Sequence, residues 1–221
     1  MKITRRTWNG CGAFVVGLLS LALIARAQIG TPVNIGSTQS TDSFSTSLNV
    51  NTTQAVPAGA SVIVIANSVP NGGGSATPTA AACSDSGGHT YNTDASEFNS
   101  NAAFGLTTIC STHGLASQLS SGATVTVTWS GGSAPWTQDI EVFSVTGLAG
   151  TPLDETASNL GTSASPSSGT TAATAQANEL LFGAILNGGR SASGAGFSPG
   201  SNGTANPAPP PARLPTPALG A

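Results

Sequence analysis

The chain has 221 residues, of which only 7% are charged, and six basic residues stand against nine acidic ones for a formal charge of −3. A sequence so poor in Lys and Arg offers no positive surface for phosphates, which excludes nucleic acids and anionic lipid surfaces as expected partners. Solubility must come from Ser, Thr, Asn and Gly, residues that suit the turns and polar faces of β-sheets.

Residues 1–27 have the three parts of a secretory signal peptide. Basic residues at the start are followed by an apolar run and then by Ala-Arg-Ala, a small-x-small cleavage pattern that ends at Ala27. The apolar run is too short and interrupted for a stable membrane span, so none is expected after cleavage. The alternative is that the segment stays uncleaved as an N-terminal anchor. Removal of this segment leaves 194 residues with two arginines, no lysine and a formal charge of −7. The sequence therefore predicts a secreted, extracellular or cell-envelope protein.

After the signal peptide, short runs of strand-forming residues alternate with Gly-, Ser- and Asn-rich turns. The predicted strands, in chain order, cover residues 44–50, 61–69, 89–98, 103–110, 122–132, 139–148 and 178–188. The run 61–69 is apolar throughout, which predicts a strand buried on both faces. The runs 89–98 and 103–110 are expected to form a hairpin. In the run 122–132, Val125, Val127 and Trp129 alternate with threonines, a period of two that fits only a strand.

Many short strands without any capped helical stripe favour an all-β fold, an antiparallel β-sandwich of the jelly-roll or immunoglobulin-like type. We expect this domain to span residues 28–198 and a proline-rich disordered tail to span 199–221. Residues 157–178 are low in complexity. They are predicted to be a long connection with a Thr-rich edge strand near 170–174, with a flexible linker between domains as the alternative.

Two cysteines, Cys83 and Cys110, remain after cleavage of the signal peptide. In an oxidising compartment an even pair favours a disulfide. The alternative is that both are small buried apolar residues that never meet. Other ligands at metal-site spacing are missing from the sequence around them, so the prediction includes neither a metal nor a cofactor.

The stretch CSDSGGHTYN, residues 83–92, holds residue types of an active site. A trypsin-like arrangement with Ser86 as nucleophile needs a histidine before the serine, but His89 and His113 both follow it. The order Ser86, Asp94, His113 would need a strand–elbow–helix turn that this sequence lacks. We therefore expect a turn, in which Asp85 can bond backbone amides and the glycines tolerate positive φ, and we assign no catalytic residues.

This stretch resembles the D-S-x-G-N-T-Y signature of a group of exported bacterial β-sandwich modules, which occur beside immunoglobulin-like repeats in surface proteins. Three further blocks follow in the order of that family: GATVTVTWSG, DIEVFSVTGLAGTPLDETAS and NELLFGAILNGG. The resemblance covers about residues 33–197. It implies an exported surface module and brings no catalytic residues with it. The chain departs from the signature at His89, where the family has Asn. It also departs after Phe197, where the resemblance implies further strands of the sandwich and this chain has the proline-rich tail instead.

Two other features point to alternative functions. Trp136 lies in a Gly- and Pro-containing loop, where its ring could stack on a sugar or fold back over the sandwich end. Asp139 and Glu141 share one face of a strand, as the acid and base of a hydrolase would. The simpler interpretation leaves Asp139 in solvent and has Glu141 bond a turn.

The sequence thus predicts a non-enzymatic exported β-sandwich module with an adhesion, envelope-structural or extracellular binding role. The alternatives are a carbohydrate-binding module that uses Trp136 and a carboxylate-dependent hydrolase. The expected partners are extracellular polysaccharides or other surface proteins.

Overall fold

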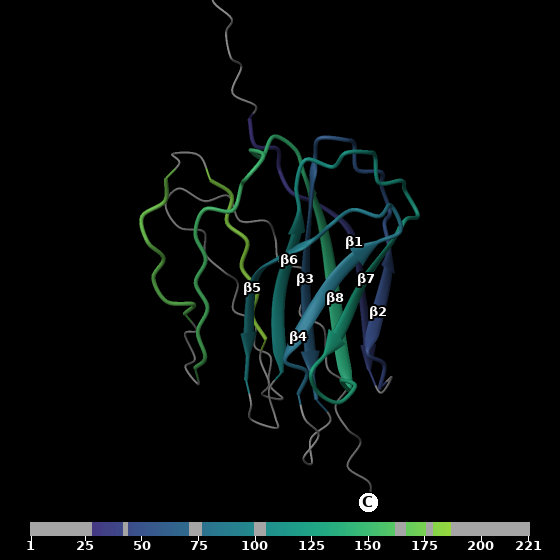
Figure 1. Ribbon diagram of the computed structural model, residues 1–221, viewed down its shortest axis with the longest axis vertical. Helices are drawn as coiled ribbons and strands as arrows, with labels where there is room; N and C mark the ends of the chain where they lie inside the picture. Colours follow the sequence, from purple (N-terminus) through teal and green to yellow (C-terminus); the bar gives the residue numbers. More distant parts are fainter. Residues whose placement is uncertain are drawn as a thin grey trace, which may run out of the picture.

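The computed structural model describes residues 28–41, 44–70, 77–99, 105–161, 167–175 and 179–186. Within these ranges the chain forms β-strands and no helix (Figure 1). The strands are β1 (Val33–Thr41), β2 (Ser47–Asn51), β3 (Ser61–Val69), β4 (Ala80–Asp85), β5 (Asn92–Phe98), β6 (Leu106–Thr112), β7 (Thr124–Ser130) and β8 (Thr137–Val145). The predicted signal peptide, 1–27, and proline-rich tail, 199–221, lie outside the described residues.

The eight strands form two antiparallel sheets, which confirms the predicted all-β sandwich. One sheet has the order β1-β8-β3-β6-β5 and the other the order β2-β7-β4. The core lies between them, because each strand turns alternate side chains inward. In β7, Val125, Val127 and Trp129 are buried in this core, as the period of two predicts. The predicted hairpin also forms, since β5 pairs with β6 antiparallel.

Two predicted strands are wrong, and two observed strands were not predicted. Residues 170–174 form no edge strand and are exposed. The described part of the predicted strand 178–188, residues 179–186, has no ladder partner. The strands that sequence patterns missed are β1 and β4, whose Ser-, Thr- and Ala-rich sequences carry no clear apolar alternation. β1 pairs with β8 and β4 pairs with β7. This pairing depends on tertiary structure, so the local sequence pattern does not predict it.

Residues 179–186 form a partial third layer on the outer face of the larger sheet. Their exposure alternates along the segment, as in a strand, although none of them forms a hydrogen bond among the described residues. The Phe182 ring meets the Phe143 ring of β8 edge-on, with centroids 5.7 Å apart. Beside Phe143, β3 turns Ile63 and Ile65 away from the inter-sheet core, yet both stay buried. The prediction that this strand is buried on both faces is therefore confirmed.

Replacing Phe182 with Ala is expected to lower the free energy of unfolding by about 1–2 kcal/mol, because the half-buried ring loses its apolar contacts with Phe143. Urea unfolding of the purified protein measures this change. Leu181→Ala is the matched control, since this neighbouring side chain is 91% exposed and its loss should change stability by less than about 0.5 kcal/mol. Equal effects of the two substitutions would show that the segment does not dock on the sheet.

Candidate functional site

The CSDSGGHTYN stretch folds as a corner between β4 and β5, organised by the carboxylate of Asp85. This side chain is fully buried. Its Oδ1 accepts hydrogen bonds from the amides of Gly87 and His89, at 2.8 and 3.2 Å. Its Oδ2 accepts from His89 Nδ1 and from the Tyr91 hydroxyl, both at 2.9 Å. Burial, then the charge of Asp85, raises the pKa of Tyr91. The predicted turn is therefore confirmed, and Asp85 is its centre.

The other polar groups of the corner are also occupied by structural contacts. His89 Nε2 lies 3.1 Å from the carbonyl oxygen of Ser117, which ties the corner to a distant loop. Ser86 Oγ accepts a hydrogen bond from the amide of Thr124, at 3.1 Å. Among the described residues neither histidine contacts Ser86. The residue in the nucleophile position of the protease-like pattern thus has no base beside it.

Cys83 and Cys110 lie at disulfide distance, with Cα atoms 6.3 Å apart and 27 positions apart in sequence. Cys83 belongs to β4 of the smaller sheet and Cys110 to β6 of the larger one. The bond therefore joins the two layers of the sandwich. It also lies beside the corner, because Cys83 is two residues before Asp85.

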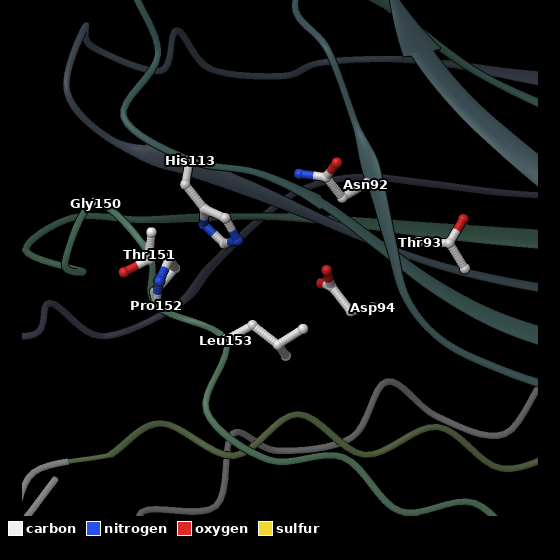
Figure 2. Close-up of a pocket in the computed structure, with 8 residues that line it drawn as sticks. All are labelled: Asn92, Thr93, Asp94, His113, Gly150, Thr151, Pro152 and Leu153. Atoms are coloured by element: carbon white, nitrogen blue, oxygen red, sulfur yellow. The ribbon is translucent and has the colours of Figure 1, made fainter. Parts of the chain in front are cut away.

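A cavity of about 260 Å³ opens at the end of the sandwich where β5 begins and β6 ends. Figure 2 shows its lining residues: Asn92, Thr93, Asp94, His113, Gly150, Thr151, Pro152 and Leu153. Asp94 reaches it through a β-bulge. Thr93 pairs with Cys110 and Ala95 with Ile109, so the residue between them has no partner on β6. A bulge re-aims the side chain of the extra residue, and here the Asp94 carboxylate points into the cavity.

His113 forms the opposite side of the cavity and is held from behind by two serines. Its Nε2 lies 2.6 Å from Ser111 Oγ and its Nδ1 lies 3.1 Å from Ser61 Oγ. Both serines are buried, at 0% and 2% exposure. Burial lowers the pKa of His113, and the nearby charge of Asp94 acts in the opposite direction. In the sequence, Asp94 and His113 were candidates for a triad with Ser86; the structure brings these two residues together without Ser86.

The two carboxylates considered for a hydrolase lie on the outer face of the larger sheet. Asp139 accepts a hydrogen bond from Asn67 Nδ2 at 2.9 Å, so it is not in free solvent as the simpler interpretation held. Burial raises the pKa of Asp139, against the effect of the Asn67 hydrogen bond. Burial also raises the pKa of Glu141, and the charge of Asp139 adds to this. The expected bond from Glu141 to a turn is not among the hydrogen bonds of the described residues.

The Asp139→Asn substitution is expected to stabilise the protein at pH 7 more than at pH 4. A native carboxyl with a raised pKa binds more protons than the unfolded one, so its contribution to stability falls as pH rises from about 4. Asparagine removes this charge, and its amide can also supply the donor that the buried Asn67 Oδ1 lacks. Urea unfolding at both pH values measures the difference. Glu141→Gln should show the same sign, whereas a pH-independent effect at position 139 would contradict the assignment.

Trp136 lies at the opposite end of the sandwich, directly before β8. Its backbone amide donates to the carbonyl oxygen of Val69 at 2.9 Å, and its side chain is partly exposed. The loop is therefore anchored to the end of β3. Because the cavity lies after the other end of β8, the two candidate binding positions cannot belong to one small site.

Within the described ranges, no group of three or more His, Cys, Asp or Glu side chains is placed to hold a metal ion. In the same part of the chain, no helix has the length and apolar character needed to cross a bilayer. Comparison with known protein families, curated proteins and solved structures gave no match to this chain.

Proposed function

We propose that this protein is an exported, non-enzymatic β-sandwich module that works outside the cytoplasm in adhesion, envelope structure or ligand binding. The observation that carries the proposal is the Cys83–Cys110 bond between the two sheets. Disulfides form and persist in oxidising compartments and are rare in the cytosol. The signal-peptide pattern of residues 1–27 predicts the same destination independently.

The side chains that suggested an active site make structural contacts, which supports a role other than catalysis. The Asp85 carboxylate is saturated by donors of its own corner. The two serines that contact His113 are buried, so a substrate has no access to their hydroxyl groups. The ring nitrogen that a triad would direct at a carboxylate faces Ser61 instead. The resemblance to exported surface modules, carried by the corner sequence, favours the same role.

Expression of the full chain with its own signal peptide in a bacterial host, followed by fractionation, tests this proposal. We expect the protein outside the cytoplasm, with a mass that corresponds to a chain starting at Gln28 and with no free thiol. A full-length chain that stays in the cytoplasm with reactive thiols at Cys83 and Cys110 would overturn it.

A carbohydrate-binding role at Trp136 is the second candidate, supported by the partly exposed ring in an anchored loop. Pull-down with insoluble polysaccharides compares the wild type with Trp136→Ala. Binding that the substitution abolishes would establish this role. Absence of binding, or binding that survives the substitution, would remove it.

A further inference from the structure

We propose that the cavity lined by Asp94, His113 and Leu153 binds a small ligand that carries a primary ammonium group on a short apolar chain. This inference names a ligand class for the extracellular binding role proposed above, and it rests on that role only for the compartment in which ligand and protein would meet.

The first reason is an uncompensated charge. The Asp94 carboxylate points into the cavity and has no hydrogen-bond donor among the described residues. The sequence contains no Lys or Arg between Arg26 and Arg190, so no Lys or Arg of the sandwich can pair with it. A carboxylate in a partly buried site gains most from a ligand that brings the missing positive charge and N–H donors.

The second reason is the state of His113, the other titratable group among the described residues that line the cavity. Burial lowers its pKa below the ordinary value, which favours the neutral imidazole over the cation that would balance Asp94. Its ring nitrogens are already engaged by Ser111 and Ser61. The cavity is thus negative at neutral pH, which disfavours phosphates and carboxylates as ligands.

The third reason is the shape and polarity of the walls. Pro152 and Leu153 form an apolar wall, and Leu153 is 53% exposed. A short carbon chain would cover this wall while the ammonium group faces the Asp94 carboxylate. The volume of about 260 Å³ is just below the usual ~300–1,000 Å³ of ligand pockets, which favours a small molecule over a stretch of polymer. A divalent cation fits poorly, since it would need several more oxygen ligands than one carboxylate provides.

The cavity also brings together residues from two sequence blocks that are far apart in the chain. Asn92 comes directly after the residues that resemble the D-S-x-G-N-T-Y signature. Pro152 and Leu153 lie in a later block, DIEVFSVTGLAGTPLDETAS. These segments meet at one place only because β5 and the chain after β8 reach the same end of the sandwich. Two of the blocks singled out in the sequence therefore converge on the proposed site.

Isothermal titration calorimetry of the oxidised protein with butylammonium at pH 8 tests the proposal. Butanol serves as the neutral ligand of matched shape. We expect a Kd on the order of 1 mM for butylammonium and binding at least about tenfold weaker for butanol. Lowering the pH until His113 is protonated should weaken butylammonium binding, because an imidazolium then competes for Asp94.

Three variants locate the binding. Asp94→Asn should weaken butylammonium binding by at least about tenfold, and Leu153→Ala should weaken it a few-fold through the apolar wall. Asp154→Asn, which removes a neighbouring carboxylate outside the cavity, should leave it unchanged. An unchanged urea midpoint verifies that each variant is folded. Equal affinity for amine and alcohol, no binding at 10 mM, or full binding by Asp94→Asn would overturn the proposal. These results are independent of export, which fractionation tests separately.

Discussion

Reduction of the Cys83–Cys110 bond is expected to lower the free energy of unfolding by about 3–4 kcal/mol. The bond closes a loop between residues 27 positions apart, and its loss frees the unfolded chain to adopt many more conformations. It also releases β4 of the smaller sheet from β6 of the larger one. Urea unfolding with and without dithiothreitol measures the change in the wild type.

The double variant Cys83→Ala, Cys110→Ala is the control for this experiment. Its stability should be as low as that of the reduced wild type, apart from the small loss of sulfur contacts, and should not respond to dithiothreitol. A thiol assay under each condition reports whether the bond is present. Full reduction of the wild type without loss of stability would show that the bond contributes nothing to the sandwich.

Asp85→Ala is expected to lower the free energy of unfolding by about 3–5 kcal/mol, the largest effect of any single substitution in the corner. The substitution removes one fully buried carboxylate that accepts from Gly87, His89 and Tyr91. The donors of His89 and Tyr91 are partly buried, and such donors are costly when they lose their acceptor. The unfolding free energy in urea gives the measurement.

Asp154→Ala is the matched control, since this exposed carboxylate accepts a hydrogen bond from the amide of Ala175. Its loss should cost less than about 1 kcal/mol. Asp85→Asn should fall between the two, because it keeps one acceptor oxygen and loses the charge. If Asp85→Ala were as mild as Asp154→Ala, the corner would not be held by its carboxylate.

Sequence patterns predicted the parts of the fold that have a strong local signal. In β7 the alternation of Val and Trp with Thr has only one structural solution, and the apolar run of β3 fits a strand covered on both faces. The turn at Asp85 was predictable for the same reason, since an Asp before two glycines satisfies backbone amides locally. These features depend on residues that are neighbours in the sequence.

Features that depend on distant partners could not be predicted in this way. β1 has a single large buried side chain, Ile35, and forms because β8 offers it a ladder. Residues 179–186 show the reverse case, with the apolar pattern of a strand but no hydrogen-bonded strand partner among the described residues. The cavity depends on a β-bulge at Asp94, where β5 has one residue without a partner on β6. The local sequence does not predict such a bulge. The Cys, Ser, Asp and His side chains of residues 83–92 suggested an active site in the corner. The cavity lies next to the corner, at Asp94 and His113.

We propose that the polar clusters of the corner and of the outer sheet face are structural, and that ligands bind in the Asp94–His113 cavity. The most direct test is a titration of ¹⁵N-labelled oxidised protein with butylammonium, followed by amide chemical shifts. We predict saturable shifts confined to residues 92–94, 113 and 150–153. Shifts centred on Asp85 to Tyr91, on Asp139 and Glu141, or on Trp136 would contradict the claim, as would a spectrum without change.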